Sequence, residues 1–443
     1  MRVDFYHTGN RDLELFSLDE VVLEPLPWPG NMLQPIDSTY RGKYAFAVVD
    51  PDSGAVAWSR SFSSIYGEWE TTGEAREINR TFHESLRFPA QSRAFDIVIS
   101  KRGEKNAFEE VWRARIDPSD YLVHQETAAH ADHVVVIEKN GDPARKVDLL
   151  ILGDGYTAAD KEEFVAKAKE MTEILFATSP FKERRSDFNV WALAPPAAQS
   201  GVSRPSTGIY RDSPLGATYD AFRSERYVLT TENKAFRRIA SSVPYDFVEI
   251  LTKSETYGGG GIYGLYGTVA ADSDWARYVF VHEFGHHFAG LADEYYTSSV
   301  AYEAPEEIEE PYEPNVTALK DPAKLKWRRL VGPQTPLPTP WPKEEFEEHA
   351  LAYQAIRTKM REENRPESEM NELFRTNQDF VKNLFSATDY RNVIGAFEGA
   401  NYQAKGFFRS AQNCIMFTRV EDFCAVCSAA IEQVIDEYTK AAD

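Results

Sequence analysis

The sequence predicts an α+β protein, with an N-terminal β-sandwich followed by a mixed sheet that is covered by helices. Three observations indicate this order. Short strand-like runs separated by turn residues fill residues 1–125. A strand, a helix and a second strand follow within residues 147–193, and a further helix begins near residue 272. Many short strands are typical of a sandwich, whereas strands alternating with helices are typical of a sheet packed by helices.

The expected N-terminal domain comprises residues 1–125. Proline and glycine in Asp50–Gly54 give a turn signal between two of its strands. No cluster of metal-ligating or catalytic residue types stands out in this domain, so we place no reaction centre there. The strands that we expect are residues 2–7, 43–49, 55–61, 94–100 and 111–116.

Residues 126–443 form the expected second domain. Residues 147–152 are an apolar run typical of a buried strand, and residues 188–193 and 247–251 are further strands. Residues 301–385 are an expected insertion that begins as an acidic, proline-rich surface segment. It continues as a helical hairpin whose expected apolar faces are Phe346, Ala350, Tyr353, Ile356 and Met360, then Met370, Phe374, Asn377, Val381 and Leu384.

A helix in the second domain carries the pattern that indicates chemistry. His282 and His286 are four residues apart, so both imidazoles lie on one helix face and can reach one metal ion. Glu283 follows the first histidine and can act as the general base toward metal-activated water. This HExxH spacing is that of the zinc-binding helix in metallopeptidases. The alternative interpretation is a pair of buried core histidines.

A third metal ligand is expected after the helix. Gly290 can end the helix in a left-handed conformation and turn the chain back. Asp293 lies three residues beyond that glycine, which is the spacing of the third ligand in the longer zinc signature. The sequence therefore predicts His282, His286 and Asp293 as metal ligands, with Glu294 as the alternative third ligand.

Two further segments are candidates for supporting this site. The glycine-rich segment with Gly259, Gly260 and Tyr263 could form one wall of a substrate cleft, since an extended peptide can pair with a sheet edge. The alternative is a flexible connector. Met416 is a candidate for an apolar floor beneath the metal, as in the methionine turn of long-signature zinc peptidases, or else an ordinary core methionine.

The three cysteines, Cys414, Cys424 and Cys427, lie close together near the C-terminus. A structural zinc site would need a fourth ligand, and no nearby histidine offers one. One disulfide with a free thiol, or three buried thiols, are the two arrangements that we expect.

The formal net charge of −21 argues against nucleic acid and anionic membranes as partners. No apolar run approaches the length of a membrane span, and the first residues lack the core of a signal peptide. The protein is therefore either cytoplasmic or an exported protein whose signal is absent from this sequence. The sequence makes no prediction about oligomeric state.

The segment HEFGHHFAGLADEY, residues 282–295, resembles the active-site segment of the bacterial IgA peptidase family of zinc metallopeptidases. Residues 152–157, 397–402 and Cys414 with Met416 resemble other parts of that family, and residues 24–30 and 67–72 resemble its N-terminal domain. The resemblance implies a zincin-like catalytic domain and an exported or surface-associated enzyme. It places Zn²⁺ on His282, His286 and Asp293, with Glu283 as the acid and base.

We therefore expect a zinc-dependent endopeptidase that hydrolyses extracellular proteins, with immunoglobulin-like proteins or glycoproteins as candidate substrates. The family name records immunoglobulin cleavage by one member and does not fix the substrate of this chain. Two alternatives remain open. One is a surface protein that binds glycans or proteins and keeps a vestigial metal site. The other is a zinc amidase that acts on cell-wall material with the same chemistry.

Overall fold

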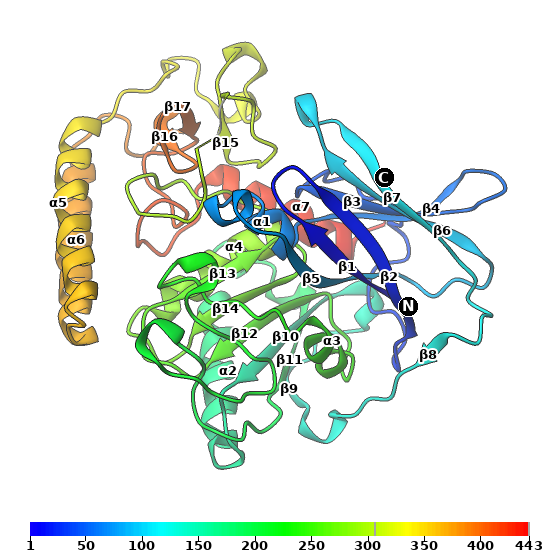
Figure 1. Cartoon of the computed structure of the whole chain (residues 1–443). Coiled ribbons are helices and arrows are strands. Elements are labelled where there is room, and N and C mark those ends of the chain that lie inside the picture. The colour runs from blue at the N-terminus through cyan, green and yellow to red at the C-terminus, as the bar shows by residue number, and fades with distance from the viewer. Residues whose placement is uncertain (305–306, 442–443) are drawn as a thin grey trace.

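The computed structural model describes residues 1–304 and 307–441 and shows a mixed α+β protein with a β-rich N-terminal part, as predicted (Figure 1). Residues 305–306 of the predicted insertion and residues 442–443 at the end of the second predicted domain lie outside the described residues. Among the described helices, none combines the length and apolar character that crossing a membrane requires.

The N-terminal part contains two four-stranded sheets. The first has the order β5-β1-β2-β8 and the second has the order β4-β3-β6-β7. Phe5 and Val21 from the first sheet share one apolar core with Phe46 and Ile97 from the second. Two long strands, β2 and β5, were not predicted. The strands are β1 (Arg2–Gly9), β2 (Glu14–Leu23), β3 (Tyr44–Val49), β4 (Val56–Phe62), β5 (Arg80–Arg87), β6 (Phe95–Arg102), β7 (Phe108–Ile116) and β8 (Val123–Gln125).

The second part is built around a six-stranded mixed sheet with the order β13-β14-β12-β10-β11-β9. Its four central strands are parallel, and the two edge strands are antiparallel to their neighbours. The central strands β10, β11 and β12 are buried along their whole length, as a parallel sheet covered on both faces requires. The strands are β9 (Val135–Glu138), β10 (Val147–Asp154), β11 (Phe188–Leu193), β12 (Phe247–Thr252), β13 (Gly259–Ile262) and β14 (Tyr266–Ala270).

Helices cover one face of this sheet, and the N-terminal part contributes to the cover of the other. Leu149 and Ile151 of β10 share a core with α2 (Lys161–Leu175), α4 (Ala276–Ala289) and α7 (Ala425–Thr439). The alternate residues Leu150 and Leu152 pack with α3 (Asn233–Ala240) and with α1 (Ile65–Trp69) of the N-terminal part. The N-terminal part is therefore attached to the six-stranded sheet through a continuous apolar contact.

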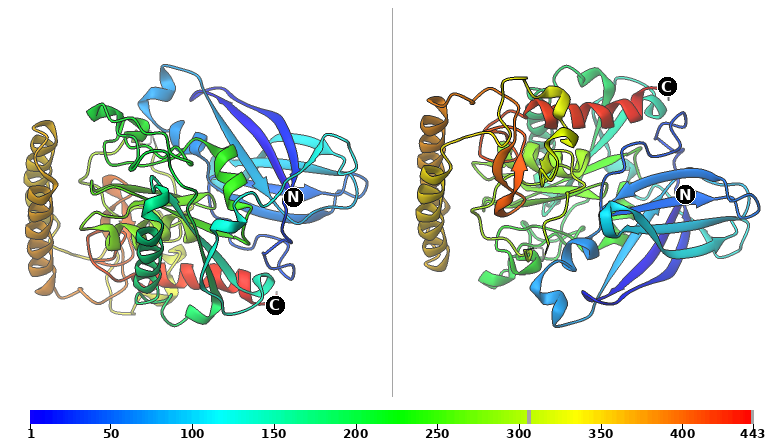
Figure 2. Two further views of the ribbon diagram at one scale, coloured as in Figure 1. Left: turned by 90° about the horizontal axis from the view of Figure 1, so that it is seen from below. Right: turned by 90° about the horizontal axis from the view of Figure 1, so that it is seen from above.

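The predicted helical hairpin is present as α5 (Lys343–Glu362) and α6 (Glu367–Ser386), at the opposite end of the molecule from the N-terminal sheets (Figures 1 and 2). Its buried face differs in part from the prediction. Ile356 is 50% exposed, and Arg357 takes the buried position because it pairs with Glu225 at 2.8 Å. Between α4 and the last helix, a small sheet contains β15 (Val316–Thr317), β16 (Phe397–Ala400) and β17 (Gln403–Arg409).

Arg41 joins the N-terminal part to two helices of the second part. Its buried guanidinium donates to the carbonyl oxygen of Ala289, at the end of α4, over 2.8 Å. It also donates to the carbonyl oxygen of Ala430 in α7 over 2.9 Å. The N-terminal part thereby contacts the end of the helix that carries the histidine pair.

Glu437 in α7 lies at the same junction and gives a testable pH dependence. Its carboxylate is 5% exposed and the nearest cation, Arg60 Nε, is 4.0 Å away, too far for a hydrogen bond. Burial raises the pKa of Glu437 from 4.5 to about 7. Folding therefore favours the protonated form of Glu437, so the contribution of this group to stability is greatest below pH 4.5 and falls by about 3 kcal/mol as the pH rises to 7.

Glu437→Gln is expected to stabilise the protein by about 3 kcal/mol at pH 8 and to change it little at pH 4. Denaturant unfolding at both pH values measures the difference. Glu432→Gln on the exposed face of α7 is the matched control and is expected to have no such effect. Equal effects of Glu437→Gln at the two pH values would contradict this explanation.

Candidate metal centre

Two histidines of α4 are held by backbone carbonyl groups. His282 Nδ1 lies 2.9 Å from the carbonyl oxygen of Ile415, and His286 Nδ1 lies 2.6 Å from that of Leu291. A carbonyl oxygen accepts a hydrogen bond, so each Nδ1 carries a proton and each Nε2 is the ring atom that can bind a metal once it is deprotonated. Metal-ligating histidines are oriented in this way in proteins.

The two Nε2 atoms converge on a carboxylate oxygen. They lie 3.2 Å from each other and each lies 3.1 Å from Asp293 Oδ1. Burial alone would lower the pKa of His286, but the charge of Asp293 and a hydrogen bond to it raise this pKa to about 9. The three atoms thus form a buried group that stabilises positive charge, and two imidazoles with one carboxylate are a donor set that suits a zinc ion.

Asp293 reaches the histidines because Gly290 ends α4 in the left-handed conformation, with φ of 58°. The turn is closed by hydrogen bonds from Gly290 N to His286 O and from Leu291 N to Gly285 O. Burial opposes ionisation of Asp293, but the positive charge and hydrogen bonds of the histidines hold its pKa well below the usual value. The alternative ligand, Glu294, does not join this group, because its carboxylate lies with the three cysteines.

Glu283 lies on the same helix and contributes to the lining of the cleft above the histidines. Burial raises the pKa of its carboxyl group, and the positive charge on the histidines opposes that rise. A carboxylate with a raised pKa beside a metal site is suited to accept and return a proton.

Met416 lies beneath α4. Its sulfur is 3.0 Å from the position that a β carbon on Gly285 would occupy, so a larger residue at Gly285 would require Met416 to shift. The carbonyl oxygen of Met416 accepts a hydrogen bond from Glu294 N over 2.9 Å. This location agrees with the expected apolar floor, while its role in metal binding stays a prediction.

A cleft of about 500 Å³ opens over the group, and its walls come from both parts of the chain. Gly259, Gly260 and Tyr263 all lie on its lining. The two glycines also allow close packing, because a β carbon would come within 2.6 Å of Val279 at Gly259 and within 2.3 Å of Tyr227 at Gly260. Bulky substitutions there would therefore disturb packing as well as any bound peptide.

Two polar residues of the cleft, Tyr402 and Arg226, were not predicted from the sequence. Tyr402 donates to Asp293 Oδ2 over 2.6 Å, and Arg226 donates to the hydroxyl oxygen of Tyr295 over 3.2 Å. Tyr402 and Arg226 lie in segments distant in sequence from α4, so no local spacing connects them with the histidines. The available signal for Tyr402 was its place in one of the segments that resemble the IgA peptidase family.

Comparison with known protein families settles the assignment of the chain. Residues 135–435 match the family model described as IgA Peptidase M64, and residues 1–113 match the model described as Peptidase M64 N-terminus. The chain belongs to the IgA peptidase M64 family. This confirms the resemblance inferred from the sequence and makes the protein a metallopeptidase, a hydrolase that acts on protein or peptide. No curated protein matches the chain.

Tyr402 offers a test of how this M64 peptidase positions its acidic ligand. Tyr402→Phe removes the hydrogen bond to Asp293 Oδ2 and keeps the ring. Loss of such an outer partner is expected to weaken metal affinity about 10–100-fold. Competition with a chelator measures the affinity. Tyr210→Phe, at an exposed tyrosine, is the control, and equal affinities of the two variants would contradict this role of Tyr402.

Proposed function

We propose that the chain is a zinc-dependent endopeptidase that cleaves extracellular proteins. The observation that carries this proposal is the convergence of His282, His286 and Asp293 below a cleft whose lining includes Glu283. The donor set fits zinc, which accepts nitrogen and carboxylate ligands and leaves a position open in catalytic sites. We also propose that the two parts are a β-sandwich and a zincin-like catalytic domain, divided near residue 125.

Glu283 is proposed as the proton carrier. When bound, the metal supplies Lewis-acid polarisation of the scissile carbonyl group and lowers the pKa of water. The Glu283 carboxylate takes a proton from the attacking water molecule and returns it to the nitrogen of the departing amine. The raised pKa of Glu283 favours the first transfer, because the conjugate base of a weaker acid is a stronger base toward water.

Tyr295 and Arg226 are proposed to support the carbonyl oxygen of the substrate. Both line the cleft, and the Arg226 guanidinium lies 5.4 Å from the centre of the Tyr295 ring. The centres of the Tyr295 and His282 rings are 6.3 Å apart, and the two ring planes are nearly parallel. Since Arg226 donates to the Tyr295 oxygen, the tyrosine hydroxyl remains a donor, and we propose that it turns from the neighbouring Asp293 to a substrate oxygen that gains negative charge.

The edge of β13 supports an extended peptide as the substrate. The N–H and C=O of Gly259 point away from β14 and bond to Arg226 O and Val228 N. The N–H and C=O of Gly261 also point away from β14, because the backbone groups of alternate residues face the same edge of a strand. Within the described residues, no backbone hydrogen bond occupies this edge at Gly261, and Gly261 lines the cleft. One residue of an extended peptide can therefore pair there.

We propose export, and a preference for immunoglobulin-like proteins or glycoproteins, from the likeness to the IgA peptidase family alone. The zinc amidase alternative uses the same metal chemistry, and the binding-protein alternative requires none. The intact donor set together with Glu283 favours an enzyme over a vestigial site.

Incubation of the zinc-loaded chain with immunoglobulins, with other glycoproteins and with peptidoglycan fragments tests the proposal. We expect internal cleavage of one or more proteins and no release from peptidoglycan, with Glu283→Gln as the inactive control. Release from peptidoglycan alone would favour the amidase. Binding of a protein or glycan without hydrolysis would favour the binding protein.

A further inference from the structure

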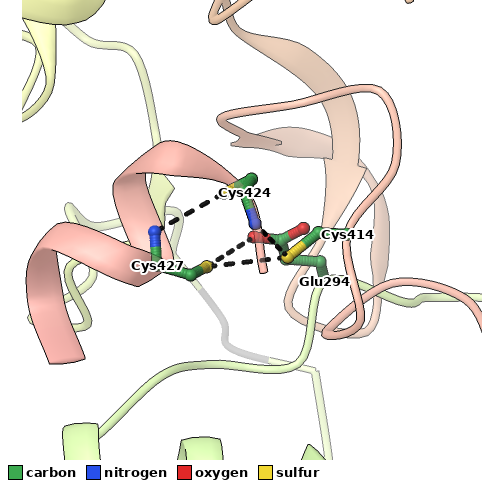
Figure 3. A group of neighbouring side chains, drawn as sticks. All are labelled: Glu294, Cys414, Cys424 and Cys427. Carbon is green, nitrogen blue, oxygen red and sulfur yellow. Dashed lines mark hydrogen bonds between the residues drawn. The ribbon is translucent and has the colours of Figure 1, made fainter. Parts of the chain in front are cut away.

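A second buried group of metal-ligating atoms lies apart from the histidine site. It contains Cys414, Cys424 and Cys427, joined by Glu294 from a distant part of the chain (Figure 3). The three sulfurs and a carboxylate oxygen lie within 4.8 Å of one another. Cys414, Cys427 and Glu294 are at most 1% exposed, so the group is enclosed by the protein. Glu294 is distant from the cysteines in sequence, so the cysteine spacing did not predict it as the fourth ligand.

The spacing of the group matches a tetrahedral site rather than a disulfide. Cys414 Sγ and Cys427 Sγ are 3.8 Å apart, and Cys427 Sγ is 3.7 Å from Glu294 Oε1. Ligands at about 2.3 Å for sulfur and about 2.0–2.2 Å for carboxylate oxygen give tetrahedral edges of about 3.8 Å and about 3.6 Å. A disulfide would need the two sulfurs at about 2.05 Å.

The surroundings supply hydrogen-bond donors to sulfur. Cys424 N lies 3.3 Å from Cys414 Sγ, and Cys427 N lies 3.5 Å from Cys424 Sγ. Ser410 Oγ lies 3.1 Å from Cys424 Sγ. Cys424 also caps the N-terminus of α7, where the helix dipole favours a thiolate. Such donors are typical of the outer partners that orient metal-bound thiolates.

Glu294 is aimed into this group and is incompletely satisfied. Asn315 donates to Glu294 Oε1 over 3.0 Å and fixes the carboxylate. Within the described residues, Glu294 Oε2 has no hydrogen-bond partner although the side chain is fully buried. An enclosed carboxylate oxygen without a partner costs free energy unless a cation or a proton neutralises it. The buried Arg409 nearby bonds to the carbonyl oxygens of Gly399 and Gln412 instead.

We propose that Cys414, Cys424, Cys427 and Glu294 bind a structural zinc ion. Thiolates with one carboxylate select zinc among the common divalent metals, and a set of four protein ligands closes the coordination sphere. None of its ligands belongs to the histidine group, so its metal can be assayed separately from the proposed hydrolysis.

The proposed ion also braces the histidine site. Glu294 follows the ligand Asp293, and Cys414 precedes Ile415, whose carbonyl oxygen fixes His282. The two segments are already joined by the hydrogen bond from Glu294 N to Met416 O. A metal ion between Glu294 and Cys414 would therefore hold both segments against α7.

Metal content of the full-length chain purified with zinc tests the proposal. We expect roughly two zinc ions per chain, falling to roughly one in His286→Ala and to roughly one in Cys427→Ser. Each variant is the matched control of the other, because each removes a ligand of a different site. Replacement of zinc by cobalt reports on thiolate ligation by absorption spectroscopy in proteins that keep all three cysteines. The wild type and His286→Ala should both show sulfur-to-cobalt charge-transfer absorption in the near ultraviolet.

Alkylation of the chain in denaturant and chelator, without a reductant, distinguishes three free thiols from a disulfide. All three cysteines are expected to be labelled, because none forms a disulfide. A Cys414–Cys427 disulfide, absence of the sulfur-to-cobalt absorption in both proteins, or iron in place of zinc would overturn the proposal. If the second zinc is present but the chain cleaves no protein, the proposed hydrolytic function fails and this site stands.

Discussion

Glu283→Gln is expected to lower kcat for protein cleavage by about 10²–10⁴-fold while the histidine site keeps its metal. The amide keeps the size of the carboxylate but cannot take a proton from water. Glu283 is not one of the three converging ligands, so its replacement leaves the donor set complete. Steady-state kinetics together with elemental analysis separate a catalytic effect from metal loss.

Two results bear directly on this role of Glu283. Glu255→Gln, at a carboxylate in an exposed turn, is the control and should retain wild-type turnover. Wild-type turnover in Glu283→Gln would show that another group carries the proton. Loss of the metal in that variant would instead assign Glu283 to the structure of the site.

Asp293→Asn is expected to remove the metal of the histidine site and with it the activity. The substitution replaces the charged oxygen, 3.1 Å from both Nε2 atoms, by a neutral amide. Zinc affinity should fall by more than about 100-fold, which is the upper effect of losing a residue that only supports a ligand. The larger loss is expected because Asp293 is itself a proposed ligand. Zinc titration of the chelator-treated chain, followed by protein cleavage, measures both quantities.

Glu294→Gln is the matched comparison, because it alters the next residue and belongs to the cysteine group. It should keep the metal on the histidines, whereas Asp293→Asn should not. If Glu294→Gln lost that metal and Asp293→Asn kept it, Glu294 and not Asp293 would be the third ligand of the histidine site. The alternative third ligand considered from the sequence would then be the correct one.

Local spacing predicted the part of the site that lies within one helix and its end. His282 and His286 are fixed by helical geometry, and Gly290 turns the chain so that Asp293 reaches them. The strands β10, β11 and β12 of the six-stranded sheet were also predictable, because they are short and mostly apolar. Tyr402 and Arg226 were not predictable, since only tertiary packing brings them to the cleft.

The same limit applies to the cysteine group and to the hairpin. Glu294 joins cysteines that begin 120 residues later, and only the return of the chain beside α4 shows this contact. In α5, helical periodicity predicted Ile356 on the buried face, but an ion pair with Glu225 places Arg357 there. Apolar periodicity does not register a buried charge that is neutralised by a distant partner.

The central claim is that a metal on His282, His286 and Asp293 is required for hydrolysis. Protein cleavage by the chelator-treated chain during stepwise return of zinc tests it most directly, with His286→Ala treated in parallel. We predict no cleavage by the metal-free chain, recovery in the wild type, and no recovery in His286→Ala at any zinc concentration that loads the wild type. Cleavage by the metal-free chain, or full recovery in His286→Ala, would contradict the claim.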